Sequence, residues 1–124
     1  MRTYKNRICR DPKNRKKFIC SDNPEKGKFA YTSYKVMRIY GNYSLVLFRI
    51  HTGRTHQIRV HSRYLGCPVL GDPIYGKKDV NFPDATLMLH AKKLRIRLPE
   101  EGRFRTFKAP LPGRFKKIIC ELRK

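Results

Sequence analysis

The chain has 124 residues, of which 40% are hydrophobic and 31% charged. Thirty lysines and arginines against nine acidic residues give a net charge of +21, which favours a polyanionic partner, above all nucleic acid. Without an apolar run of about 18 residues or a long basic amphipathic helix, a membrane partner is not expected. Basic residues stand where a signal peptide needs an apolar core, so a cytoplasmic protein is expected.

The length allows a single domain over residues 1–124. Residues 1–28 are dense in charge and are predicted to be a loop or an exposed edge, with a turn at Asp11-Pro12. The alternating segments 29–40 and 43–51 predict two strands, which Gly41-Asn42 joins into an antiparallel hairpin.

Thr52-Gly53 ends the second strand, and Thr55 is predicted to cap a short helix that stops near Gly66 and Pro68. A helix start exposes unpaired N–H groups and the positive end of the helix dipole. Basic side chains lie at this start, so the segment is predicted to bind an anion. They are Arg54, His56 and Arg59.

After a loop rich in Gly and Pro, residues 87–98 predict a strand with Leu94, Ile96 and Leu98 facing inward. Its outward row is basic and consists of Lys93, Arg95 and Arg97. Residues 99–102 should turn the chain into a paired strand, 104–108, and residues 112–122 show the spacing of an amphipathic helix that covers the sheet. The expected fold class is α+β: a mixed, largely antiparallel sheet with a short active-cleft helix and a C-terminal helix.

The four cysteines are too widely spaced for a recognisable zinc site, and His56 and His61, five residues apart, do not share a helix face. No metal is therefore expected. Reduced thiols are the expected state of the cysteines, and a catalytic cysteine paired with a histidine is the alternative.

The segment 52–61, Thr-Gly-Arg-Thr-His-Gln-Ile-Arg-Val-His, resembles the RluA-like pseudouridine synthases. The resemblance continues through Gly66-x-Pro68-x-x-Gly71-Asp72-x-x-Tyr75-Gly76. It also extends to Gly27–Val36, Leu89-His90-Ala91 and Phe107–Pro112, and so covers nearly the whole chain.

This resemblance implies isomerisation of uridine to pseudouridine in ribosomal or transfer RNA, without metal or organic cofactor. It implies that Arg59 is catalytic and pairs with the nucleophilic aspartate. It further implies RNA or substrate contacts by Arg54, Thr55, His56, Gln57, His61, Leu89 and His90, the leucine segment lining the pocket wall. Asp72 is not the nucleophile of the pattern and is expected to bind turn amides or a neighbouring basic side chain.

Two motifs of the family are absent: His-Arg-Leu-Asp followed by Thr-Ser-Gly, which holds the nucleophile, and the Lys-x-Tyr that stacks on the base. The sequence is therefore interpreted as the C-terminal portion of a synthase catalytic domain, inactive alone and complemented by an upstream half. Self-association of the exposed edges is also expected. The alternative is a non-catalytic basic RNA-binding or ribosome-associated protein, which explains the charge but not the motif.

Overall fold

The computed structural model describes residues 1–97 and 103–124, except for the side chain of Ile96. These residues divide into two compact units, 1–88 and 89–124. The expectation of a single domain over the chain stays a prediction. Within the described residues, no helix is both long and apolar enough to cross a bilayer.

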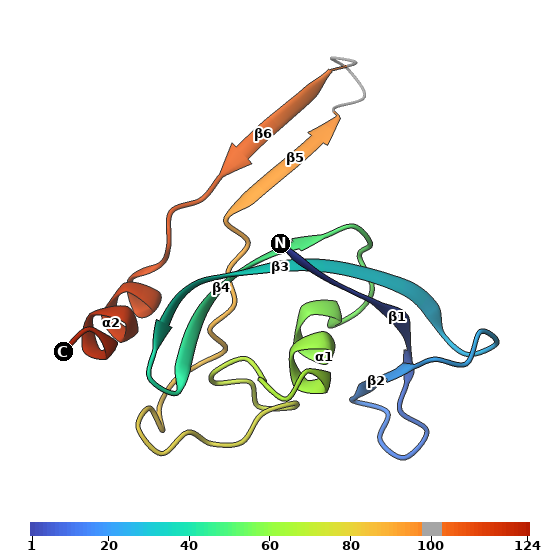
Figure 1. Ribbon diagram of the computed structural model, residues 1–124, viewed down its shortest axis with the longest axis horizontal. Helices are drawn as coiled ribbons and strands as arrows, with labels where there is room; N and C mark the ends of the chain where they lie inside the picture. The colour runs from blue at the N-terminus through green and yellow to red at the C-terminus, as the bar shows by residue number, and fades with distance from the viewer. Residues whose placement is uncertain (98–102) are drawn as a thin grey trace. The chain divides into compact units, whose positions relative to one another are not determined.

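The first unit is built on a four-stranded antiparallel sheet with the order β2-β1-β3-β4 (Figure 1). Its strands are β1 (Arg2–Arg10), β2 (Phe18–Ser21), β3 (Lys28–Tyr40) and β4 (Tyr43–Ile50). The prediction of a loop or exposed edge over residues 1–28 is thus wrong for β1, a strand inside the sheet between β2 and β3, whereas β2 is an outer strand of the described sheet. The charged residues of β1 conceal an alternation in which Asn6 and Ile8 are buried.

The predicted hairpin is confirmed by the antiparallel pairing of β3 and β4 around Gly41, whose φ is 61°. Ala30 and Thr32 are buried as the alternation predicts, but Val36 is 46% exposed. Figure 1 shows that the far end of the hairpin extends beyond the helix that covers the first half of β3.

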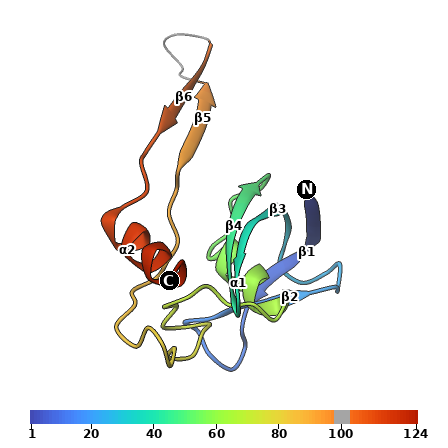
Figure 2. The same cartoon turned by 60° about the vertical axis from the view of Figure 1, so that its left-hand side comes forward.

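That helix, α1 (Gln57–Tyr64), packs on β1, β2 and β3, as the second view shows (Figure 2). Its residue Val60 joins Ile8, Ala30 and Tyr75 in the buried core. The predicted cap at Thr55 is wrong: His56 occupies the capping position with a left-handed φ of 54° and makes no side-chain capping bond. The turn is instead stabilised by the side chain of Gln57.

The second unit contains β5 (Lys93–Arg97), paired antiparallel with β6 (Phe104–Lys108), and helix α2 (Gly113–Leu122). This confirms the pairing, the C-terminal helix and the α+β class with antiparallel sheet. The strand does not begin at Leu87, because its partner stops at Lys108 before Ala109-Pro110, and proline cannot donate to a ladder.

Leu94 is 54% exposed, so its predicted inward orientation is wrong in this unit, where no described element covers that face of the hairpin. Leu98 and the predicted turn at 99–102 lie outside the described residues. The apolar stripe of α2 is half-buried, and its packing on the main sheet stays a prediction.

Candidate active site

Arg59 is held by Asp72 through two parallel hydrogen bonds. Its Nε donates to Oδ2 at 2.9 Å and its Nη2 donates to Oδ1 at 2.8 Å. The Asp72 side chain is fully buried and that of Arg59 is 13% exposed. This fork uses only one edge of the guanidinium, and Nη1 has no hydrogen bond to the described residues. A second carboxylate could bind that edge in the same bidentate manner.

Asp72 is itself fixed by the loop that carries it, since its Oδ1 also accepts the backbone N–H groups of Ile74 and Tyr75 at 3.0 and 3.1 Å. Burial alone would raise the pKa of Asp72, but the bonds from Arg59 and the two amides outweigh it and lower the pKa below its usual value. Both oxygens are occupied and shielded, so Asp72 is a positioning residue. The expectation that it binds turn amides and a basic side chain is confirmed.

Tyr75 forms the floor under the arginine. The Arg59 guanidinium carbon lies 5.2 Å from the centre of the Tyr75 ring. The Tyr75 hydroxyl accepts the Phe18 N–H at 2.9 Å and lies 2.8 Å from His56 Nδ1. Burial, followed by the neighbouring Arg59 charge, lowers the pKa of His56. His56 therefore connects the start of α1 to β2 and to the loop that carries Asp72 and Tyr75, as a neutral imidazole.

Gln57 stabilises the turn before α1. Its Oε1 accepts the Thr52 hydroxyl at 2.8 Å and the Arg54 N–H at 3.0 Å, and its Nε2 donates to the Tyr31 carbonyl at 3.0 Å. Arg54 Nε donates to the Phe29 carbonyl at 2.8 Å. Thr55 is exposed beside them. The turn is thus fastened to β3 while Thr55 and part of Arg54 remain open to a ligand.

His61 lies at the centre of a buried polar network and is 1% exposed. Gln57 Nε2 donates to Thr32 Oγ1 at 2.8 Å, so the Thr32 hydroxyl hydrogen can point to His61 Nδ1 at 2.7 Å. His61 Nε2 lies 2.8 Å from Asn6 Oδ1 and donates to it in this tautomer. Burial lowers the pKa of His61 to about 4, so the ring is neutral.

The sequence predicts RNA contacts for Gln57 and His61, but both are buried with their polar atoms engaged, so in this structure they position α1. Asn6 and Thr32 complete the network, but their contacts with His61 were not predicted, because they lie 55 and 29 positions from it in the sequence. The Gly-Asp-x-x-Tyr-Gly spacing was the available signal for Asp72. Leu89 and His90 belong to the second unit, where His90 Nε2 lies 3.2 Å from the Ala109 carbonyl oxygen.

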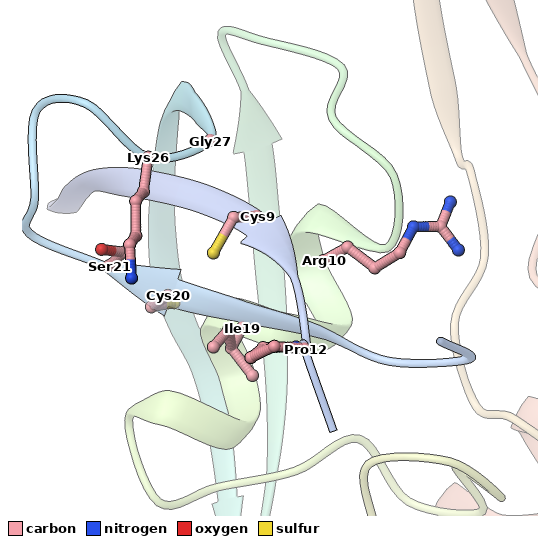
Figure 3. A pocket seen from close by; sticks show the side chains of 8 residues that line it. All are labelled: Cys9, Arg10, Pro12, Ile19, Cys20, Ser21, Lys26 and Gly27. Carbon is pink, nitrogen blue, oxygen red and sulfur yellow. The ribbon is translucent and has the colours of Figure 1, made fainter. Parts of the chain in front are cut away.

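An open hollow of about 340 Å³ lies at the β1–β2 hairpin, away from Arg59 (Figure 3). In Figure 3, Lys26 reaches toward Ser21 whereas Arg10 points away from the hollow. Cys9 and Cys20 line it as free thiols. In the described part of the chain, no three His, Cys, Asp or Glu side chains gather as a metal site, and the expectation of no metal stays a prediction.

Residues 2–64 match the family described as RNA pseudouridylate synthase. Over 108 residues the chain is 45% identical to a ribosomal large subunit pseudouridine synthase D of Borreliella burgdorferi, covering 87% of this chain and 32% of that one. An uncharacterized RNA pseudouridine synthase of Chloroflexus aurantiacus is 39% identical, and the match covers 93% of this chain and 35% of that one. The chain therefore belongs to the RNA pseudouridylate synthase family, and it spans about a third of the length of these curated relatives.

A solved structure of human RNA pseudouridylate synthase domain containing 1 superposes with a TM-score of 0.72 at 27% identity. The superposition covers 98% of this chain and 58% of the human one. Human RNA pseudouridylate synthase domain containing 4, at 23% identity and a TM-score of 0.73, shares the fold.

Proposed function

We propose that this chain is part of an RNA pseudouridine synthase, to which it contributes the active-site arginine and an RNA-binding face. The single observation that carries the proposal is the Arg59–Asp72 fork. It holds a guanidinium at the start of α1 with one edge available for a second carboxylate. An arginine in contact with a carboxylate keeps that carboxylate ionised, as a nucleophile requires.

In the proposed reaction the N1–C1′ bond of uridine breaks, the base turns, C5 bonds to C1′, the proton of C5 is lost and N1 takes up a proton. No oxidant or cofactor is needed. The attacking carboxylate and the base-stacking tyrosine are not found in this sequence, and in the proposal an upstream segment supplies both. Asp72 cannot take the nucleophile's place, because both of its oxygens are engaged and buried.

Ribosomal RNA is the favoured substrate, since three of the matched relatives are named ribosomal large subunit pseudouridine synthase D, and transfer RNA is the alternative. The proposed location is the cytoplasm. Thr55, the partly exposed Arg54 and His90 are proposed to contact RNA. Leu89 is proposed to line the pocket wall.

The test is release of tritium from 5-tritiated uridine in ribosomal RNA. The chain alone should release none. Release should begin when a polypeptide that carries the His-Arg-Leu-Asp and Lys-x-Tyr segments is added, and should be lost when the aspartate of that segment is replaced by asparagine. Steady release by the chain alone would overturn the proposal. RNA binding without release in any mixture would favour the non-catalytic RNA-binding protein.

A further inference from the structure

Tyr31 and His51 form a stacked ring pair outside the site described above. Their ring centres are 3.9 Å apart with an angle of 22° between the planes. Lys5 Nζ lies 4.6 Å from the centre of the Tyr31 ring. Lys5 comes from β1 and His51 follows β4, the strands on the two sides of β3. Tyr31 is thus flanked by a cation and an imidazole.

This cluster lies on the face of the sheet opposite α1. Ala30 and Thr32 face α1, so Tyr31, between them on β3, faces the other way. Lys5 alternates in the same manner with the buried Asn6. The cluster therefore lies on a different surface from the Arg59 guanidinium.

The ring pair is held rigidly. The Tyr31 N–H donates to Thr52 Oγ1 at 2.9 Å, and its carbonyl accepts the His51 N–H at 3.0 Å. His51 Nε2 lies 2.8 Å from the hydroxyl oxygen of Ser33, which is itself buried. His51 is nevertheless exposed. Its ring is pre-positioned, so a flat ligand that stacks on it would not have to order a mobile side chain.

We propose that His51, backed by Tyr31, is a stacking site for an unpaired base of RNA, with Lys5 placed for an adjacent phosphate. Unpaired bases are recognised by stacking on rigid aromatic or imidazole rings beside cationic side chains, and this mode tolerates any base. A base within a duplex cannot reach His51 in this way. The site therefore selects single-stranded segments of an RNA over duplex segments. The inference rests on the proposed function, because it assigns part of the RNA face of that enzyme.

The test is a fluorescence titration of the full chain with a short single-stranded oligouridylate carrying one 2-aminopurine, compared with an RNA duplex of equal length. His51→Ala should weaken single-strand binding by about 5- to 20-fold, which is the lower part of the range of affinity lost when one base–aromatic stack is removed. It should also abolish 2-aminopurine quenching. Duplex affinity should change little. His51→Phe should retain both binding and quenching, since a flat ring remains. Lys5→Ala should lower the salt slope of single-strand binding by about 0.7.

Tyr64→Ala is the matched control, because Tyr64 is an aromatic residue 58% exposed on α1. It should change neither binding nor quenching. Unchanged single-strand affinity of His51→Ala, or an equal loss for both RNAs, would overturn the stacking site and leave the proposed function intact. If the wild-type chain bound neither RNA, the stacking site and the proposed RNA face would both be wrong. Circular dichroism of each variant verifies its folding.

Discussion

At the residue scale, the arrangement of Arg59 explains why an acidic residue as well as an arginine follows the Thr-Gly-Arg-Thr-His-Gln motif. A guanidinium on the long, flexible stem of an arginine would sample many positions on a helix surface. The buried Asp72 carboxylate, itself fixed by two backbone amides, restricts it to one. Arg59 should therefore be oriented before substrate or nucleophile arrives.

The first prediction concerns Arg59 in the complemented enzyme. Arg59→Ala should lower the single-turnover rate roughly 100-fold or more while changing RNA affinity little, because it removes the partner of the nucleophile and only one of thirty basic residues. Arg59→Lys should recover only part of the rate. It keeps the positive charge, but an ammonium cannot bind two carboxylates through two pairs of parallel hydrogen bonds.

Arg63→Ala is the control for this experiment, because Arg63 is an exposed arginine on the same helix. Thermal unfolding must be followed in parallel, since Arg59→Ala leaves Asp72 buried without its partner, at a cost of about 3–5 kcal/mol. A normal single-turnover rate in folded Arg59→Ala would contradict the catalytic assignment.

The second prediction concerns pH. The folded-state pKa of His61 is lowered to about 4, below its ordinary value of 6.5, so protons bind preferentially to the unfolded chain. The stabilisation is complete above about pH 6.5 and is lost as the pH falls toward 4, by about 3 kcal/mol if the shift is fully expressed. Urea unfolding across this range measures it.

His61→Asn should be less stable at neutral pH but should lack most of this slope. A smaller slope remains because the pKa of His56 is lowered as well. Below about pH 4 both proteins should lose further stability, because the lowered pKa of Asp72 means that its carboxylate must then be protonated. Parallel pH profiles of wild type and variant would show that His61 is not the titrating group.

At the scale of elements, the loop between α1 and the second unit depends on Gly71. Its φ is 77°, and a Cβ there would lie 2.1 Å from the Thr86 carbonyl oxygen. Gly66 has a similar φ of 84° but nothing within 4 Å of its Cβ position. The two glycines therefore differ in crowding and not in backbone strain.

The third prediction uses this pair. Gly66→Ala should cost about 1–2 kcal/mol of unfolding free energy from the left-handed conformation alone. Gly71→Ala should cost at least about 2 kcal/mol more, because backbone must move, and it should displace the adjacent Asp72 and reduce activity. Urea unfolding of both variants is the measurement, and equal losses would refute the crowding argument.

The β5–β6 hairpin has a basic face, because Lys93 lies directly opposite Lys108 and Arg95 lies 4.8 Å from the ring of Phe104. Like charges opposite each other across a strand pair are unfavourable unless an anion lies between them. The fourth prediction is that Lys93→Ala/Lys108→Ala lowers the slope of log K against log salt for structured RNA by about 1.4–1.8. Lys116→Ala/Lys117→Ala on α2 removes the same charge and should change the slope less. Equal effects would show that the net positive charge of the chain, and not the hairpin, determines the salt dependence.

At the scale of the whole molecule, β4 is the outer strand of the described four-stranded sheet, and it carries half-exposed apolar side chains. Leu47 is 42% and Ile50 is 50% exposed. An apolar edge strand is a template for pairing with a second chain.

The fifth prediction is that the chain self-associates with rising concentration and that Leu47→Lys shifts sedimentation velocity toward the monomer. Val80→Lys adds the same charge at a loop residue that is 93% exposed and should have little effect. If both variants shift the self-associated protein toward the monomer equally, the cause of the shift would be charge repulsion and not the loss of pairing at the edge strand.

Local signals in the sequence were sufficient for the β3–β4 hairpin, for a helix after Thr52-Gly53 and for α2, because turn geometry and helix periodicity depend on residues close in the chain. The motif at 52–61 was sufficient for the family. The same local reasoning was wrong for β1, where charged side chains on the exposed face hid Asn6 and Ile8. It was also wrong for Thr55, because Gln57 rather than a side-chain cap stabilises the turn.

The sequence by itself therefore determined the class of fold and the family, and it showed that an arginine, Arg59, stands in the family motif. These follow from short-range patterns and residue identity. Only the tertiary structure decided that Arg59 is held by Asp72, and that His61 is buried against Asn6, 55 positions away. These choices depend on which distant strands and loops come together. A polar side chain in a buried network has the same local sequence as one in water, so only its packing distinguishes the two.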